Sequence, residues 1–207
     1  SKQPIKEEYL LDSALESTNQ WYALAKISGI KLCESLYIQY GINAISLMPC
    51  NLFGPGDNYD LRGSHVLPAF IRKFETAKIN HEKEVICWGT GEALREFLYV
   101  DDLAEACIFA LRNWDITSDD APRNSSLKKL AWLNVGSGKE ISIKDLSLKI
   151  SNLVGYEGKI IWDKDKPDGT PRKLMDTSKI RSLGWSPKTT LNDGIKFTIN
   201  DFKKNYF

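Results

Sequence analysis

The feature that most constrains this chain is one long helical stretch near its beginning, residues 16–41 (ESTNQWYALAKISGIKLCESLYIQYG). Its apolar residues recur at roughly the helical period. Polar residues at 16–19 supply N-cap chemistry, and Gly41 provides a natural end. We therefore predict one amphipathic helix over residues 16–41. Its apolar stripe consists of Leu24, Ile27, Ile30, Leu36 and Tyr40.

This helix carries Tyr22 and Lys26, four residues apart. Residues at i and i+4 lie on one helix face, so the phenol and the ammonium point the same way. A neighbouring cation stabilises a phenolate, which makes Tyr22 a candidate proton donor to a carbonyl that is being reduced. The alternative is a half-buried ring beside a solvated amine. The chain holds 8 tyrosines and many lysines, so a pair at this spacing is expected by chance and does not decide between the two.

Composition excludes several classes of function. A chain of 207 residues with 42% hydrophobic and 27% charged residues is typical of a globular protein of one large domain or two small ones. The net charge of +1 provides no field that would attract nucleic acid or an acidic membrane. The distribution of charge is less even, because residues 159–207 hold eleven Lys or Arg against six Asp and no Glu. This excess fits either an anionic ligand or a solvated basic face.

Cysteine and histidine usage indicates a reducing setting without a metal. The four cysteines are widely spaced and form no C-x-x-C pair, which predicts packed, reduced thiols and a cytoplasmic location. Only His65 and His81 are available, so we expect no histidine-based metal site. We also expect no membrane span and no signal peptide, because the apolar runs are too short and none opens the chain.

A candidate ligand-binding loop follows the first helix. Residues 44–48 (AISLM) form a short apolar run that predicts a buried strand, and residues 49–56 (PCNLFGPG) then break regular structure. Open α/β sheets bind ligands beyond the carboxyl ends of their strands, so the amide of Asn51 is a candidate contact for a phosphate or a hydroxyl. The alternative is an asparagine that only forms the turn.

A second candidate begins at His65, which precedes a predicted helix over residues 66–74 with proline in its first turn. The positive end of a helix favours neutral imidazole, so His65 is a candidate base. Lys73 lies on the same helix and could reach a phosphate. A histidine that caps the helix or is merely exposed is the alternative.

The rest of the chain alternates short strands and helices, which predicts an α/β fold. Residues 1–15 are expected to be an irregular lead-in, and residues 115–129 and 165–173 to be loops. Ser142 and Asp145 form a predicted capping box. The predicted strands are residues 84–88, 95–100, 132–135 and 159–162, and the predicted helices are residues 103–114, 142–153, 177–183 and 191–205.

Taken in order, these features resemble a known family. The Tyr22/Lys26 helix is followed by MPCNLFGP, then WGTGEALREFLYVDD, then LNVGSG. This series resembles the extended short-chain dehydrogenase/reductases that act on nucleotide sugars. Within that group, the stretches YALAKISGIKLCESLYIQYG, SHVLPA and KPDGTPRK resemble the GDP-L-fucose synthase family.

The resemblance implies that the chain is the C-terminal part of an extended Rossmann-type reductase, with late parallel strands and helices and a smaller mixed α/β substrate-binding lobe. Residues 1–60 would be the remainder of the dinucleotide-binding domain. Residues 61–207 would mainly form the substrate-binding lobe, with about residues 96–136 returning to the Rossmann sheet. The glycine-rich phosphate loop and the family's catalytic serine and cysteine would precede Ser1.

The resemblance further implies an activity. Members of this family epimerise GDP-4-keto-6-deoxy-D-mannose at C3 and C5 and then reduce it at C4 with NADPH, forming GDP-L-fucose. His65 would be the base of the epimerisation, and Tyr22 with Lys26 would supply the proton in the reduction. The implied cofactor is NADP(H), with contacts from Tyr22, Lys26, Pro49, Cys50, Asn51, Leu52 and His65.

The resemblance also implies a set of residues that bind the GDP-sugar substrate. Trp88 would offer a stacking surface and Arg95 a planar fork for phosphate. The alternatives are core packing for Trp88 and a surface ion pair for Arg95. Lys73 stands where the family often has arginine, so it keeps the charge but loses the bidentate fork. The implied substrate contacts are Asn51, Lys73, Trp88, Arg95, Asp168 and Lys173.

The implied partners are the GDP-sugar and a second copy of the chain. Related reductases pair this long helix with its counterpart, so we expect a homodimer through residues 16–41. No nucleic acid or membrane partner is expected. Two other interpretations stay open: a nucleotide-sugar-binding module without catalysis, and a related reductase or epimerase that acts on another sugar.

Overall fold

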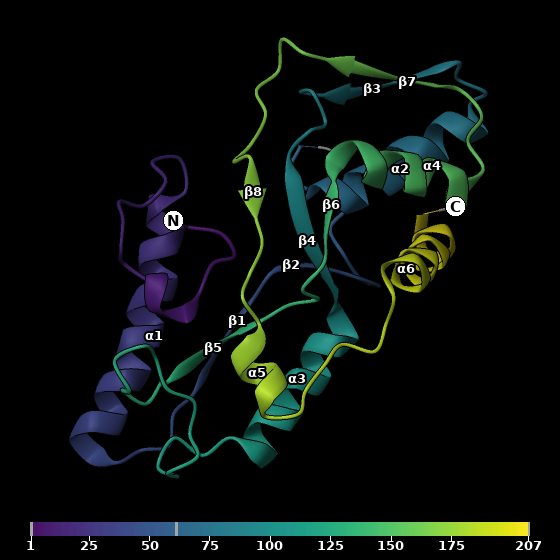
Figure 1. The fold of residues 1–207 in the computed structure, drawn as a ribbon. Helices are drawn as coiled ribbons and strands as arrows, with labels where there is room; N and C mark the ends of the chain where they lie inside the picture. Colours follow the sequence, from purple (N-terminus) through teal and green to yellow (C-terminus); the bar gives the residue numbers. More distant parts are fainter. Residues whose placement is uncertain (1, 61, 207) are drawn as a thin grey trace. The chain divides into compact units, whose positions relative to one another are not determined.

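The computed structural model describes residues 2–60 and 62–206 (Figure 1). Positions 1, 61 and 207, which bound the predicted domains, lie outside the described residues. The chain divides into two compact units. Unit 1 comprises residues 1–50, 103–138 and 175–187, and unit 2 comprises residues 51–102, 139–174 and 188–207. The assignment of a cofactor domain to residues 1–60 and a substrate lobe to residues 61–207 stays a prediction.

Unit 1 is built on one parallel strand pair, β1 with β5, in which Ser46 lies opposite Trp132. All four residues of β5 are buried, as expected of a parallel strand that is covered on both faces. Helix α3 (Val100–Asn113) belongs to this unit from residue 103 onward. The other elements are η1 (Glu7–Tyr9), α1 (Gln20–Tyr40), β1 (Ser46–Pro49), β5 (Trp132–Val135) and α5 (Ser178–Ser182).

Helix α1 begins four residues later than predicted, at Gln20. Its N-cap, Asn19, forms no side-chain capping hydrogen bond. Its end is as predicted, because Gly41 takes the left-handed conformation at φ 67° and donates its N–H to the Tyr37 carbonyl.

The predicted apolar stripe of α1 is only partly right. Ile27, Ile30 and Leu36 are half-buried, whereas Leu24 and Tyr40 are exposed, and no residue of α1 is fully buried in the described structure. Helical period places a residue on a face, but the neighbouring elements decide how wide a strip of that face is covered.

The N-terminal segment is more ordered than the irregular lead-in that we predicted. Ile5 forms a β-bridge with Met175, and Glu7 in η1 is fully buried. The Glu7 carboxylate accepts hydrogen bonds from Lys179 Nζ at 2.9 Å and from the Asn134 N–H at 3.1 Å. A buried carboxylate requires such partners, because an unpaired charge inside a protein is costly. These bonds tie the lead-in to α5 and β5.

Unit 2 combines two small sheets with three helices. Strand β4 is central to the first sheet: it pairs in parallel with β2 and β8 and antiparallel with β6. Strands β3 and β7 pair in parallel as the second sheet. The elements are β2 (Asn51–Phe53), α2 (Val66–Ile79), β3 (Glu84–Trp88), β4 (Leu94–Tyr99), β6 (Glu140–Ser142), α4 (Ile143–Val154), β7 (Lys159–Asp163), β8 (Arg172–Lys173) and α6 (Leu191–Tyr206).

Three strands of this unit were not predicted. Strand β2 lies inside the predicted loop of residues 49–56, β8 lies inside the predicted loop of residues 165–173, and β6 directly precedes α4. Each has only two or three residues and pairs with β4. A strand this short shows no alternating apolar pattern in the sequence. Strands β3 and β4 are close in sequence but belong to different sheets, because their partners lie elsewhere in the chain.

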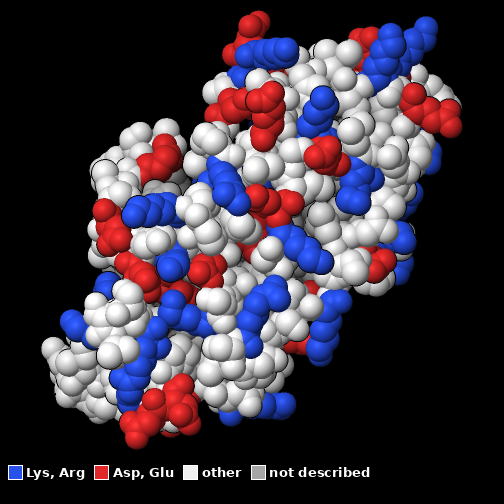
Figure 2. All heavy atoms as spheres, viewed as in Figure 1, with Lys and Arg blue, Asp and Glu red and all other residues white. Residues whose placement is uncertain are grey.

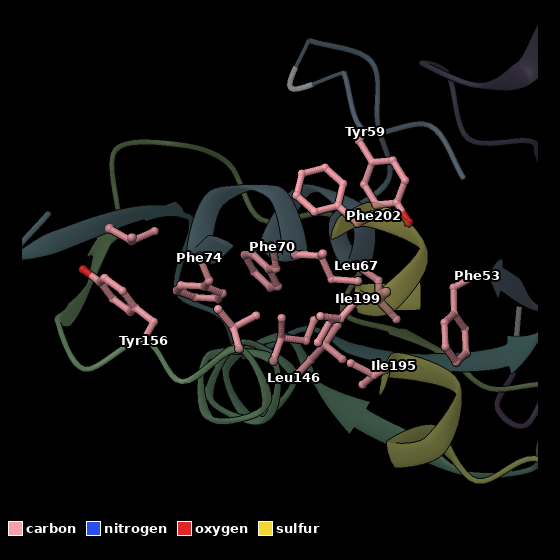
Figure 3. Close-up of a cluster of buried hydrophobic side chains, with 14 of the residues drawn as sticks. Phe53, Tyr59, Leu67, Phe70, Phe74, Leu146, Tyr156, Ile195, Ile199 and Phe202 are labelled. Atoms are coloured by element: carbon pink, nitrogen blue, oxygen red, sulfur yellow. The ribbon is translucent and has the colours of Figure 1, made fainter. Parts of the chain in front are cut away.

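The core of unit 2 is a cluster of aromatic and aliphatic side chains from α2, α4 and α6, together with residues of β2, β3, β4 and two loops (Figure 3). Phe74, Leu146 and Phe202 are fully buried within it. A Cβ on Gly194 of α6 would lie 2.8 Å from the Phe53 ring. Only glycine therefore lets α6 come this close to β2.

The charges on the surface agree with the expectation from composition. Basic and acidic side chains are interspersed on the face drawn in Figure 2, in keeping with the net charge of +1.

The four cysteines are free, but only Cys87 is buried and Cys107 is exposed, so the expected packing of the thiols holds for Cys87 alone. Burial raises the pKa of Cys87 to about 11. Among the helices of residues 2–60 and 62–206, none is long and apolar enough to cross a bilayer.

Candidate active site

The first candidate site lies on α1 in unit 1, where Tyr22 and Lys26 share one face as predicted. The Lys26 ammonium lies 5.5 Å from the centroid of the Tyr22 ring. Both side chains are exposed, and Tyr22 keeps 62% of its surface accessible. An exposed cation–π contact contributes about 0.5–1 kcal/mol, which holds the amine near the phenol without burying either group. The pair is therefore adjacent and open to a ligand.

The predicted ligand loop after β1 is instead a direct passage from β1 to β2. Pro49 ends β1, Cys50 donates its N–H to β5 at 2.9 Å, and Asn51 and Leu52 lie in β2. The side-chain amide of Asn51 donates to the Glu96 carbonyl of β4 at 2.8 Å. Asn51 is therefore a strand residue bonded to its neighbouring strand, and the turn interpretation is wrong. Its contact with a ligand stays a prediction.

His65 is the N-cap residue of α2, and its exposed side chain forms no capping hydrogen bond. The capping interpretation is therefore wrong, whereas the interpretation as a merely exposed histidine stays open. The role of His65 as a base stays a prediction. A carboxyl group, Asp57, lies within its electrostatic reach. Burial raises the pKa of Asp57, while a hydrogen bond from the Asn58 N–H and the charge of His65 oppose that shift. Asp57 Oδ2 and Ser64 Oγ are buried without a hydrogen-bond partner among the described atoms.

The second candidate site lies in unit 2 around Trp88, the last residue of β3. The indole is 67% exposed, so the core-packing interpretation is wrong. Lys73 of α2 and Lys166, which follows β7, each place an ammonium 5.8 Å from the ring centroid. Lys73 Nζ also donates to the Ile86 carbonyl at 2.9 Å, which holds this lysine against the strand that carries Trp88.

Arg95 and Asp168 belong to the same unit and interact electrostatically. The Asp168 carboxylate accepts from the Thr90 N–H at 2.9 Å and from the Thr90 hydroxyl at 2.7 Å, and these bonds hold the pKa of Asp168 below its usual value. Burial lowers the pKa of Arg95, and the charge of Asp168 opposes that shift. A Cβ on Gly89, at φ +79°, would collide with Asp168, so only glycine allows the two loops to meet.

Strand β8 adds a further cation to this site, because it places Lys173 opposite Arg95 of β4. The neighbouring Arg172 forms a bidentate pair with Glu140, with both nitrogen–oxygen distances 2.8 Å. Such a planar two-bond contact is geometrically specific, and it fastens β8 to β6. Five predicted substrate residues thus lie in unit 2: Lys73 on α2, Trp88 on β3, Arg95 on β4, Lys173 on β8, and Asp168 in the loop between β7 and β8.

Sequence reasoning missed three residues of these sites: Lys166, Thr90 and Asp57. Each belongs to a residue type that is common on surfaces, and only a tertiary contact makes it special. The motifs KPDGTPRK and WGTGEALR marked the segments of Lys166 and Thr90, but the patterns did not indicate which residues meet. Within the part of the chain that the structure describes, no group of three or more His, Cys, Asp or Glu side chains is placed to hold a metal ion.

These features define a class of protein. Parallel strand pairs with intervening helices are typical of Rossmann-type folds, and the exposed Tyr22/Lys26 pair of α1 agrees with the resemblance to the reductases. A sequence model of the NAD dependent epimerase/dehydratase family matches residues 1–120, which is more than half of the chain. The chain therefore belongs to that family.

Three individual relatives are each named for a GDP-sugar. GDP-L-fucose synthase 1 of Arabidopsis thaliana is 53% identical over 203 residues, which cover 98% of this chain and 59% of that protein. A GDP-6-OMe-4-keto-L-xylo-heptose reductase from C. jejuni superposes with a TM-score of 0.89 at 38% identity, covering 99% of this chain and 66% of that one. A GDP-mannoheptose C4 reductase from Campylobacter jejuni with NADP bound superposes with a TM-score of 0.84 at 37% identity, over 98% and 66% of the two chains. The chain thus spans 59% to 66% of the length of these relatives.

Proposed function

We propose that this chain supplies the proton donor and the GDP-sugar-binding residues of an NADPH-dependent epimerase-reductase that converts GDP-4-keto-6-deoxy-D-mannose to GDP-L-fucose. The observation that carries the proposal is the exposed Tyr22/Lys26 pair in a chain 53% identical to a GDP-L-fucose synthase. In unit 2, Trp88 and the cations around it have the chemistry that such a substrate requires. An aromatic plane suits a base, and positive charge suits a diphosphate.

NADP(H) fits the open face of α1. The Tyr22 phenol and the Lys26 ammonium are both exposed and adjacent, so they are available to a ribose hydroxyl and to the reacting carbonyl. A related reductase was solved with NADP bound. When bound, NADPH supplies the hydride for C4. The residues that would hold it are Tyr22, Lys26, Pro49, Cys50, Asn51, Leu52 and His65.

The residues of this chain then carry out two proton transfers. In the epimerisation, His65 removes the acidic proton beside the C4 ketone, at C3 and at C5 in turn, and an acid returns a proton to the opposite face. Configuration inverts at both carbons. In the reduction, Tyr22 donates its hydroxyl proton to the C4 oxygen as that carbon gains hydride, which leaves an alcohol and a phenolate. Lys26 stabilises the phenolate through its charge.

The GDP part of the substrate is assigned to unit 2. Trp88 stacks against the base, and Lys73 and Arg95 neutralise the diphosphate. Asp168 orders its loop through the bonds from Thr90 and accepts from a sugar or ribose hydroxyl. Lys173, opposite Arg95, adds a cation. Asn51 completes the predicted contacts.

The role of Tyr22 is tested by Tyr22→Phe in the full-length enzyme, which removes the donated proton and keeps the ring. We expect kcat for NADPH oxidation with the 4-keto sugar to fall about 100-fold or more, because a positioned general acid contributes roughly 10²–10⁴-fold. Tyr40→Phe, which alters another exposed tyrosine of α1, is the control and should retain activity. Full turnover by Tyr22→Phe would contradict the proposal.

The role of His65 is tested in the same enzyme by deuterium exchange at C3 and C5 of the substrate. His65→Asn should slow exchange about 100-fold or more on the same grounds. His81→Asn, which alters the only other histidine, should not change it. Unchanged exchange in His65→Asn would remove this residue from the mechanism.

A second candidate is reduction of a different GDP-4-keto sugar. The observation in its favour is that both structural relatives described above are reductases of GDP-heptoses. Comparing kcat/KM for 6-deoxy-hexose and heptose substrates separates the two. A preference for the heptose would replace the first proposal. The absence of turnover on either, with GDP-sugar binding retained, would favour a binding module without catalysis.

We also propose that α1 forms a homodimer interface. Trp21, Leu24 and Leu32 lie at i, i+3 and i+11, on one side of the helix, and are 74%, 45% and 59% exposed. A second copy would remove this apolar surface from water. Sedimentation of the full-length protein should show a dimer, and a monomer at high concentration would count against the interface.

A cytoplasmic location is part of the same proposal. All four cysteines are free thiols, as is usual in a reducing compartment. Cell fractionation that finds the protein in an oxidising compartment would contradict it.

A further inference from the structure

The two lysines beside Trp88 are held in different ways. Lys73 Nζ donates to the Ile86 carbonyl at 2.9 Å as well as approaching the ring. The Lys166 ammonium lies 5.8 Å from the ring centroid, and within residues 2–60 and 62–206 no hydrogen bond or ion pair engages it. An ammonium carries three donors. Lys166 therefore keeps its donors for water or for a ligand.

The segment that carries Lys166 is nevertheless fixed. The Lys166 N–H donates to the Asp163 carbonyl at 3.3 Å, which closes a turn after β7. Two residues further on, Asp168 is held by the two hydrogen bonds from Thr90. These hydrogen bonds hold the backbone on both sides of Lys166. The backbone is thus fixed beside Trp88, while the ammonium forms no hydrogen bond or ion pair with the described residues.

The acidic groups near Lys166 have other roles. Asp168 is bonded to Thr90, and its charge acts on Arg95. Asp163 accepts the Asp165 N–H at 3.1 Å, and the Asp165 side chain is exposed, where solvent screens its charge. Two ammonium groups thus share one ring, and their mutual repulsion would be relieved by an anion with more than one charge.

We infer that Lys166 is a further binding residue for a nucleoside diphosphate, and that its ammonium binds the second phosphate when a base stacks on Trp88. This inference rests on the proposed function, because it requires a base at Trp88. The nucleotide base and the ammonium groups compete for the face of the Trp88 indole. The base displaces Lys166 more easily than Lys73, because Lys73 is hydrogen-bonded to the Ile86 carbonyl. The displaced ammonium then pairs with the phosphate oxygens, which bind it more strongly than a ring does.

Lys166→Met tests this inference, because methionine removes the charge and keeps an unbranched side chain of similar length. Titration calorimetry on the full-length protein should show the Kd for GDP rising about tenfold, as expected for the loss of one charge-assisted contact. The Kd values for GMP and guanosine should stay within about twofold, since neither carries a second phosphate. Lys164→Met is the matched control: it removes an exposed lysine of the same turn and should leave all three Kd values unchanged.

The outcomes separate this inference from the proposed function. Unchanged GDP affinity in Lys166→Met would overturn the inference, and so would an equal loss for GDP, GMP and guanosine. Trp88→Ala should weaken all three ligands. If it weakens none of them, the base site is wrong and the role of Lys166 falls with it. If Trp88→Ala weakens binding and Lys166→Met does not, the base site stands and only the role of Lys166 is wrong.

Discussion

Glu7 depends on partners that lie far from it in the chain. Its carboxylate is fully buried and meets Lys179 Nζ at 2.9 Å. Burial alone would lower the pKa of Lys179, but the hydrogen bond and the charge of Glu7 raise it above its ordinary value of 10.5. Because the folded pKa lies above the unfolded one, the stability from this pair is fully present below pH 10.5 and is lost as the pH rises through the folded pKa.

Glu7→Gln should therefore lower the free energy of unfolding by about 3 kcal/mol at pH 7, because it removes the buried carboxylate and leaves Lys179 Nζ with the more distant Glu8 carboxylate, at 3.6 Å. The alkaline loss of stability should shrink in the same variant. Chemical denaturation at pH 7 and at alkaline pH measures both. Glu34→Gln, which breaks the half-exposed pair of Glu34 with Lys31, should cost less than about 1 kcal/mol. Equal losses in the two variants would show that the Glu7 pair is no stronger than a surface pair.

The start of helix α4 is determined by its local sequence. Ser142 Oγ accepts the Asp145 N–H at 2.9 Å and donates to Asp145 Oδ2 at 2.6 Å, so the predicted cap is confirmed. The strands predicted at residues 132–135 and 159–162 are confirmed as β5 and β7, because each is long enough to show its own apolar pattern. Strands β2, β6 and β8 carry no such pattern, since β4 supplies their pairing.

Ser142→Ala should destabilise the protein by about 1 kcal/mol, because the N-terminal N–H groups of α4 lose their acceptor. The midpoint of denaturant unfolding should fall while the slope m stays unchanged. Ser126→Ala, at an exposed position in the loop of residues 115–129, should change the free energy of unfolding by less than about 0.5 kcal/mol. A Ser142→Ala variant as stable as the wild type would mean that water replaces the cap.

At the scale of the whole molecule, each unit is assembled from three separate segments of the chain. The residues proposed for proton transfer to the carbonyl lie in unit 1, and Trp88 with its surrounding cations lies in unit 2. The net charge of only +1 gave no sign of this cationic group, and the excess of Lys and Arg over residues 159–207 left a solvated basic face as the alternative. Resemblance to a family supplied most residues of the two sites, whereas residue patterns alone left Tyr22, Asn51, His65 and Trp88 each with an alternative.

The sequence by itself determined the elements and residues whose signals are local: the Tyr22/Lys26 face of α1, its end at Gly41, the cap of α4 and the longer strands. Periodicity, capping and turn chemistry act over a few neighbouring residues, so a linear pattern contains them. Only the tertiary structure decided which of these elements meet. The contacts of Thr90 with Asp168 and of Glu7 with Lys179 join residues 78 and 172 positions apart. Such contacts exist because the core and the sheets bring distant segments together, and no short stretch of sequence records them.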